Sequence, residues 1–480
     1  MNATDLLALS PLIVLTVTSA VVMLAIAFHR DHRLTFGLTL AGLLLALASL
    51  AWSASYAPRP VTPLLILDDY AIYFSGLILL AGIVVTLLSY NYFQGYLGAE
   101  EYYLLLLLAS LGAIVLVTSQ HFASLFLGLE ILSVSLYSLI SYPSQQRTRI
   151  EAGIKYLILA GTTSAFLLFG IALIYAATGS LAFPSAAAEA GNSPFLETLL
   201  RIGMGMLIVG LGFELALVPF HWWTPDVYQG APAPVTAFIA TVSKGGMFAL
   251  MLRFFTLVPL TDIPSLWQVF AGIAIASMLT GNLIALMQTN VKRILAYSSI
   301  AHLGYLLVAF LAFGRYGRFA VAFYLAAYFI TTLTVFGVIT VRSTHEREVE
   351  ELDDYRGLFF QRPWLALFFS FGLLSLAGIP PTVGIIGKIF LAAAGVQSGL
   401  WLLLIVLVVG SIIGVFYYLR IAIAMFRRPE GEEARPFAMP SLLTSGTIIL
   451  GVLFLLLVGF GLYPGPLMAV ASRLVQGLGG

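Results

Sequence analysis

Long apolar runs, separated by short polar or charged stretches, fill nearly the whole of the 480-residue chain. A helix that crosses the hydrocarbon of a membrane needs about 20 apolar residues. Division of the chain at charge clusters and at Gly/Pro breaks gives about fourteen such helices. The predicted spans are residues 7–28, 35–53, 70–91, 102–118, 121–142, 150–177, 200–222, 233–256, 266–287, 295–314, 317–341, 363–392, 399–425 and 440–463. The pattern predicts an all-α, polytopic membrane protein.

The composition supports this interpretation and excludes several kinds of chemistry. Hydrophobic residues make up 60% of the chain, charged residues 9%, and the mean hydropathy is +1.00, which soluble domains do not reach. The sequence has no cysteine, so it forms no disulfide and no thiolate-held iron–sulfur cluster, and its six histidines show no haem or zinc spacing. A net charge of +1 provides no basic face for nucleic acid. Redox cofactors, if the protein serves redox chemistry, therefore belong to other chains.

Lysine and arginine collect in alternate loops, which predicts the orientation of the chain. The basic residues of this set are Arg30, Arg33, Arg147, Arg149, Lys292, Arg293, Arg342, Arg347, Arg356, Arg427, Arg428 and Arg435. We predict that these loops face the cytoplasm, so that both termini of the chain lie on the outer side of the membrane. The mixed-charge loop from Arg342 to Arg362 is expected to be solvated or to dock a neighbour.

Aromatic and basic residues near span ends have simpler expected roles. Trp222, Trp223 and Tyr228 are expected to anchor the chain at the membrane interface. Arg253 and Arg420 are expected to snorkel toward water.

Two of the apolar spans contain a proline break next to a charged residue. The first break is at Pro219, between Glu214 and the helix that holds Lys244. The second, Gly378–Pro381 with Pro380 inside it, precedes Lys388. A proline frees a backbone carbonyl that water, an ion or a side chain must satisfy within a membrane, although prolines also kink helices merely for packing. Paired interrupted segments in two halves indicate an inverted-repeat transporter whose pathway lies at the breaks.

Ionisable side chains recur inside the predicted spans, where each costs about 2.5–3.5 kcal/mol at the bilayer centre. Any one of them could be a buried structural pair or a snorkelling side chain, but the series predicts a polar axis that carries protons. The candidate residues are Glu130, Lys155, Glu214, Lys244, His302 and Lys388, with His221 nearer a helix end.

Several stretches resemble one family. HWWTPDVYQGAPAPVTAFIATVSKGGMFALMLR (His221–Arg253) is similar to the signature of antiporter-like membrane subunits of respiratory complex I and of related cation/proton antiporters. Three further stretches resemble subunit N of bacterial NADH-quinone oxidoreductase: HFASLFLGLEILSVSLYSLISY (121–142), QTNVKRILAYSSIAHLGYLLVA (288–309) and SLAGIPPTVGIIGKIFL (375–391).

The resemblance implies two inverted five-helix repeats in a membrane-arm subunit that conducts protons while other subunits do the redox chemistry. It implies helices 1–3 in residues 1–101, repeats in 102–256 and 266–425, and a last helix in 440–480. The partners would be the lipid bilayer and other membrane-arm subunits. The flavin, iron–sulfur clusters and quinone would lie in or between other subunits, and this chain would hold no cofactor. By motif, Glu130, Lys155, Lys244 and Lys388 match charged residues of the fifth, sixth, eighth and twelfth helices.

One position departs from the family pattern. The residue before the Pro219 break is normally lysine, the partner of the fifth-helix glutamate, but this chain has Glu214. Two carboxylates would repel unless one keeps its proton or a lysine such as Lys155 or Lys244 lies between them. Two alternatives stay open: an Mrp-type cation/proton antiporter subunit, and a passive scaffold of the membrane arm.

Overall fold

The computed structural model describes residues 2–143, 146–183, 193–258, 260, 263–427 and 445–477. Helices dominate these residues, as the apolar runs predict. Within them, twelve helices are long and apolar enough to cross a membrane, and a bent pair at the C-terminal end would make thirteen. The two shorter apolar helices that flank the second predicted break add one further crossing if they are counted together. The prediction of an all-α membrane protein with about fourteen crossings is confirmed.

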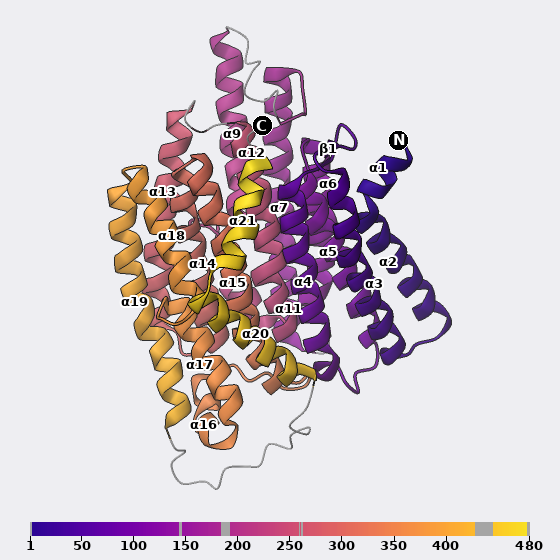
Figure 1. Cartoon of the computed structure of the whole chain (residues 1–480), viewed down its shortest axis with the longest axis vertical. Helices are drawn as coiled ribbons and strands as arrows, with labels where there is room; N and C mark the ends of the chain where they lie inside the picture. Colours follow the sequence, from indigo (N-terminus) through magenta and orange to yellow (C-terminus); the bar gives the residue numbers. More distant parts are fainter. Residues whose placement is uncertain are drawn as a thin grey trace.

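The chain begins with helices at the right of Figure 1 and continues into a first series. The opening elements are α1 (Ala3–Ala8), α2 (Ser10–Phe28), α3 (His32–Ser53), η1 (Ala54–Tyr56), the antiparallel pair β1 (Arg59–Pro60) and β2 (Ile66–Leu67), and α4 (Asp69–Tyr92). The first series is α5 (Ala99–Thr118), α6 (Phe122–Ile140), α7 (Arg147–Thr178), α9 (Pro194–Glu214), α10 (Trp223–Gly230), α11 (Ala233–Phe238), the π-helix η2 (Ile239–Ser243) and α12 (Lys244–Leu257).

A second series follows in the part of the chain coloured from pink to orange in Figure 1 and repeats the same order of elements. It comprises α13 (Pro264–Met287), α14 (Val291–Leu311), α15 (Gly314–Arg342), η4 (Leu352–Tyr355), α16 (Leu358–Gln361), α17 (Pro363–Ala377), α18 (Val383–Gln397) and α19 (Trp401–Phe426). Each series has a helix pair, then a long helix, α7 with 32 residues or α15 with 29, then a broken helix and a final helix. This order agrees with the expected five-helix repeats.

Glycines allow close helix contacts at matching places in the two series. A Cβ at Gly112 of α5 would lie 2.6 Å from the backbone nitrogen of Leu132 in α6. In the second series, a Cβ at Gly281 of α13 would lie 2.7 Å from the backbone nitrogen of Ala301 in α14. Without side chains at these crossings, the backbones approach closely, which is how membrane helices gain packing energy when lipid is as apolar as they are.

The structure moves several predicted helix ends. The predicted span 200–222 is α9, which begins at Pro194 and ends at Glu214, so the break starts before Pro219. The predicted span 363–392 is the pair α17 and α18, separated where the Gly-Ile-Pro-Pro break was expected. The last span is α20 (Ser445–Leu462), which bends by 84° into α21 (Gly465–Gly477), a helix that the sequence analysis did not separate. Residues 440–444 of that span, with Arg428 and Arg435, lie outside the described residues.

Loops that the charge pattern assigned to one side do meet in the structure. Arg149, at the start of α7, donates to the carbonyl of His345 after α15 at 3.0 Å. Lys292, at the start of α14, contacts Glu348 of the same loop at 3.3 Å. α1 and the end of α21 both lie in the upper half of Figure 1. The alternation of loops is therefore correct, and the side that faces the cytoplasm stays a prediction.

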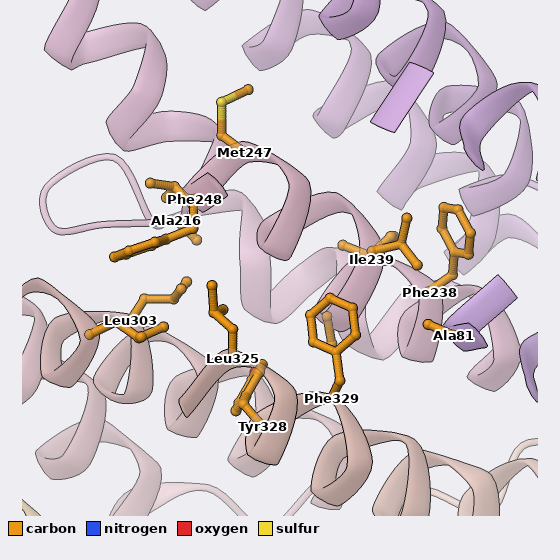
Figure 2. Packing of buried hydrophobic residues seen from close by; sticks show 14 of the residues in the cluster. Ala81, Ala216, Phe238, Ile239, Met247, Phe248, Leu303, Leu325, Tyr328 and Phe329 are labelled. Atoms are coloured by element: carbon orange, nitrogen blue, oxygen red, sulfur yellow. The ribbon is translucent and has the colours of Figure 1, made fainter. Parts of the chain in front are cut away.

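The segment Ala233–Leu257 and helix α14 form the centre of the bundle, because every residue in their apolar windows is buried. Helices α2 and α7, by contrast, leave most of their surface on the outside. Figure 2 shows Phe238 and Ile239 of the central segment beside Phe329 of α15 and Ala81 of α4. Two of the candidate residues, Lys244 and His302, thus lie in the fully buried centre of the bundle.

Candidate functional site

Lys244 lies in the central segment, directly after a π-helical turn. Pro234 occupies the first turn of α11, where a missing N–H costs nothing, and the chain widens to the π-helix at Ile239–Ser243 before α12 begins at Lys244. Single π-turns within α-helices occur frequently at functional sites. Lys244 is 1% exposed, so the whole side chain is removed from water and lipid.

The ammonium group of Lys244 is held by a hydroxyl and by aromatic rings. Its Nζ donates to Ser299 Oγ at 3.0 Å and lies 5.0 Å from the ring centre of Tyr228 and 5.7 Å from that of Trp223. Tyr228 and Tyr328 also reach Ser299 Oγ, at 3.3 and 2.8 Å. No described carboxylate lies within ion-pair distance of Lys244. Among the described residues, the Ser299 hydroxyl and the cation–π contacts are therefore the groups that stabilise its charge.

His302 continues this polar contact along α14. It follows Ser299 by three residues, so the two side chains lie on one face of the helix. Its Nδ1 is 2.6 Å from the Tyr324 hydroxyl and its Nε2 is 3.1 Å from the Tyr418 hydroxyl. The ring of Tyr328, which already touches Ser299, lies 5.5 Å from the imidazole. Two buried hydrogen-bonded groups, one around Ser299 and one around His302, are therefore adjacent through the ring of Tyr328.

Lys388 lies beside the second helix break. Its Nζ donates at 2.9 Å to the carbonyl of Ala377, the last residue of α17, and lies 5.3 Å from the ring centre of Tyr305. A helix end leaves carbonyls without intrahelical partners, so a cation is favoured there. Gly378 has φ of 82°, and a Cβ on it would lie 2.8 Å from Lys388 Cδ. The break thus needs glycine both for its backbone conformation and for the lysine stem.

Glu214 and Glu130 lie together on the other side of Lys244. Glu214 is the last residue of α9 and is buried, and it interacts electrostatically with Glu130 and with Tyr156. Glu130 accepts a hydrogen bond from Ser164 Oγ at 2.8 Å. The ring of Tyr156 contacts the ring of Trp223, 4.8 Å away, and Trp223 in turn lies beside Lys244. No described lysine forms an ion pair with Glu214, so neither Lys155 nor Lys244 separates the two carboxylates.

Lys155 lies apart from this network. Its side chain is 44% exposed and pairs with Glu151 at 2.8 Å and with Asp226 at 2.9 Å, around a surface hollow of about 180 Å³. Asp226 also binds Arg293 at 2.8 Å. Burial raises the pKa of Asp226, but the hydrogen bonds from Lys155 and Arg293 outweigh it and leave the pKa below its ordinary value. Lys155 lies within a candidate span, as predicted, but this turn of α7 faces outward, so its side chain is not buried among the other charged residues.

The residues predicted to support the break occupy the turn between α9 and α10. Pro219 lies in this turn, and the ring of Phe220 packs where a Cβ on Gly212 would lie, 2.7 Å away. His221 is buried and stacks on Trp222 with ring centres 5.0 Å apart. Pro380 lies in the corresponding turn between α17 and α18. The turn after α9 therefore shapes the end of the helix that carries Glu214.

Aromatic residues expected at the membrane interface have different positions. Trp222 is exposed, as an interface anchor should be, whereas Trp223 and Tyr228 are buried against Lys244. The aromatic-belt rule failed for these two because the short helix α10 turns inward. Tyr328, Ser299, Tyr324 and Tyr418 were missed altogether, since an uncharged hydroxyl in an apolar span carries no sequence signal.

Arg253 does not snorkel. It forms a buried two-point ion pair with Asp68, Nη1–Oδ2 2.7 Å and Nη2–Oδ1 2.8 Å, and its guanidinium lies 4.6 Å from the ring centre of Tyr70. Its Nε donates to the carbonyl of Val117 at 3.2 Å. The arginine therefore joins α12 to the start of α4 and the end of α5. Asp68 was missed because a carboxylate before an apolar run reads only as a helix cap.

Glu348, in the loop expected to be solvated, is inserted into the bundle. Its carboxylate accepts from the backbone nitrogen of Ala233 at 3.1 Å and from Lys292 at 3.3 Å, and Arg149 lies 3.9 Å away. Lys292 also donates to the carbonyl of Ala231 at 2.7 Å. This cluster holds the first turn of the segment that leads to Lys244. The loop from Arg342 to Arg362 is therefore packed against the helices at Glu348 and is not simply solvated.

Fold and site together define a class of protein: a multi-pass membrane protein with broken helices and buried lysines in its interior. A family model described as NADH:quinone oxidoreductase/Mrp antiporter, TM, matches residues 119–414. A chain of respiratory complex I from Thermus thermophilus is 35% identical, and the match covers 96% of this chain and 99% of that chain with a TM-score of 0.81. The chain belongs to the NADH:quinone oxidoreductase/Mrp antiporter family of membrane proteins.

Two other solved structures share the fold. A chain of an archaeal membrane-bound sulfane sulfur reductase is 25% identical over 98% of this chain and 97% of that chain, with a TM-score of 0.86. A chain of the Mrp complex from a Dietzia species is 21% identical over 99% of this chain and 97% of that chain, with a TM-score of 0.87. The architecture is thus shared by chains of three differently named membrane complexes.

Proposed function

We propose that this chain is subunit N of a bacterial NADH-quinone oxidoreductase, and that it conducts protons across the membrane while other subunits oxidise NADH and reduce quinone. The 35% identity to a chain of Thermus thermophilus complex I over nearly the full length of both chains supports this choice. The proposed partners are the neighbouring membrane-arm subunits, and the flavin, the iron–sulfur clusters and quinone would lie in or between other subunits of the complex. The proposed location is the inner membrane, with both termini in the periplasm.

The observation that carries the proposal is the hydroxyl-linked series around Lys244. An ammonium group without a carboxylate partner is expensive inside a membrane protein and is kept there for a function more often than for stability. Ser299 Oγ lies within hydrogen-bond distance of Lys244 Nζ and of two tyrosine hydroxyls, at 3.0, 3.3 and 2.8 Å. Because a serine hydroxyl has one proton to give and two lone pairs, it can accept from one neighbour while it donates to another. A proton can move along such groups by reorientation.

We assign the roles from this arrangement. Glu130 and Glu214 hold or release a proton on one side of Lys244, and Lys244 is the central carrier. Ser299, Tyr328 and His302 pass the proton toward the second repeat. Lys388, at the break after α17, is the corresponding lysine there. Lys155 is left outside the pathway because its ion pairs lie at the surface.

Replacement of Lys244 tests the proposal. Lys244→Met keeps the length and the apolar stem of the side chain but removes the proton carrier, so proton pumping by the assembled complex should be lost. Lys155→Met removes the same charge from a half-exposed ion pair and should leave pumping close to the parental rate. Pumping is measured as acidification of inverted membrane vesicles driven by NADH, with assembly checked by isolation of the intact complex. Parental pumping by an assembled Lys244→Met complex would refute the pathway.

An Mrp-type cation/proton antiporter subunit is the second candidate, because the matching family model covers both kinds of protein. The fold similarity to a chain of an Mrp complex agrees with it. Isolation of the chain from its native membrane separates the candidates. The first predicts co-purification with NADH-oxidising, quinone-reducing subunits, and the second predicts sodium-dependent proton transport in membranes that lack them.

A further inference from the structure

A basic hollow opens beside the end of α19, far along the chain from the Lys244 network. It has a volume of about 280 Å³ and is lined by residues of η4 and of the last turns of α19. Its charged residues are Asp353, Arg356, Arg420 and Arg427. Asp353 pairs with Arg356 at 2.8 Å, but both side chains are largely exposed, so this ion pair is weak. The hollow therefore keeps an excess of positive charge.

Arg420 is fixed in place by two of its five N–H donors. Its Nη1 donates to the carbonyl of Leu286 at 3.0 Å and its Nη2 donates to the carbonyl of Gln288, both at the C-terminal end of α13. These carbonyls have no helical partners, so they favour a cation and hold the guanidinium rigid. The Nε–H of Arg420 is buried and has no hydrogen-bond partner in the described part of the chain. The expectation that Arg420 snorkels freely is therefore wrong.

The wall of the hollow that follows α19 toward the membrane interior is apolar. Phe416 is 66% exposed and Ile423 is 52% exposed, and both line the hollow with Leu419. Positions 416, 420, 423 and 427 recur at helical spacing, so they form one stripe along α19. The stripe thus combines apolar side chains with two guanidinium groups, the second at the end of a membrane helix.

We infer that this hollow, defined by Arg356, Arg420, Arg427, Phe416 and Ile423, binds the headgroup of an anionic phospholipid, with an acyl chain along α19. Guanidinium groups bind phosphate oxygens through charge-assisted hydrogen bonds, and the exposed guanidinium groups of Arg356 and Arg427, beside Arg420, supply such donors. Inorganic phosphate would satisfy the arginines but would leave Phe416 and Ile423 without a partner. An anionic phospholipid matches both parts, and basic pockets on membrane proteins recognise such headgroups.

The test uses the intact complex, purified in detergent, stripped of lipid and exchanged into bilayer nanodiscs. A photoreactive phosphatidylglycerol is expected to label the stripe that contains Phe416 and Ile423, whereas a photoreactive phosphatidylcholine of the same chains is not. Excess inorganic phosphate should leave the labelling unchanged. Displacement by phosphate, or equal labelling by both lipids, would overturn the inference. A neighbouring subunit found in contact with Phe416 and Ile423 in the intact complex, with no lipid labelling there, would also overturn the inference.

Variants separate binding from folding. Loss of a charge-assisted hydrogen bond weakens binding by about 10-fold to 100-fold, so Arg420→Gln should reduce labelling strongly. Because Arg420 also binds α13, the double variant Arg356→Gln/Arg427→Gln, which changes two surface arginines, should reduce labelling while assembly stays normal. Arg33→Gln, an exposed arginine predicted on the same face of the membrane, is the matched control. Equal labelling of the double variant and the control would contradict the site.

Discussion

A substitution of Ser299 tests the proposed proton pathway most directly. Its hydroxyl is the only described hydrogen-bond partner of Lys244 Nζ, and two tyrosine hydroxyls converge on the same oxygen. Ser299→Ala removes this oxygen and changes no charge. The lysine and both tyrosines stay in place, so the substitution interrupts the series at one atom.

The structure sets the size of the expected effect. A hydrogen bond to a charged group contributes about 1.5–3 kcal/mol. Each 1.36 kcal/mol corresponds to a factor of about ten in rate. If proton transfer from Lys244 passes through the 3.0 Å contact to Ser299, Ser299→Ala should slow pumping by about 10-fold to 100-fold. NADH oxidation in uncoupled membranes should fall less, because the redox groups belong to other subunits.

The assay compares the initial rate of NADH-driven acidification of inverted vesicles with the amount of assembled complex. Ser110→Ala is the matched control, since Ser110 is a buried serine on α5 whose hydroxyl donates only to the Leu106 carbonyl of its own helix, at 2.8 Å. This control should pump at the parental rate. If an assembled Ser299→Ala complex also pumps at the parental rate, protons do not pass through this hydroxyl, and the assignment of Lys244 as the carrier toward His302 loses its basis.

Three further predictions address other parts of the molecule. Asp68→Asn leaves the buried Arg253 without its counter-charge and should lower the free energy of unfolding by about 3–5 kcal/mol. In thermal unfolding in detergent, the double variant Asp68→Asn/Arg253→Gln should lose less stability than the sum of the losses of the two single variants. Additive losses would contradict the ion pair. Glu214→Gln should leave the complex assembled and change the pH dependence of pumping, whereas an unchanged profile would show that this carboxyl is not a relay. Asp226 has a lowered pKa, so its ion pairs stabilise the fold above its ordinary pKa of 3.8 and are lost as the pH falls through the lower folded value. Because Asp226 is partly exposed, the contribution is below about 1 kcal/mol. The thermal midpoint of Asp226→Asn should therefore converge with the parental value only as the pH falls below 3.8.

The sequence predicts the helices and the buried charges well, because both follow from hydropathy. Lys244, His302 and Lys388 interrupt apolar runs, and the structure buries all three. Their partners could not be predicted in this way. Ser299 and Tyr328 are compatible with any packed membrane helix, and only the crossing of α12, α14 and α15 brings their hydroxyls to one lysine.

The errors have a common cause, which is that hydropathy does not tell which way a side chain points. Lys155 lies in an apolar span but faces the surface hollow, whereas Arg253 lies near a span end but faces the core. Glu348 belongs to a highly charged loop and is nonetheless inserted at the start of α11. In each case the rotation of a helix or the path of a loop decides the environment, and these depend on contacts between distant parts of the chain.

The π-turn at Ile239–Ser243 fixes the rotational phase of Lys244. One residue advances an α-helix by about 100°, and the turn accommodates more residues than an α-turn would. Glu348 holds the segment before this turn, and Asp68 holds it after the turn. The extra residue therefore changes the rotation of the second part about the helix axis relative to the first part. Removal of one residue from this turn would give a more regular helix, yet it would rotate Lys244 away from Ser299 unless one of the two anchors gave way. The π-turn thus allows Lys244 to point toward Ser299 while the contacts with Glu348 and Asp68 hold both ends of the segment in place.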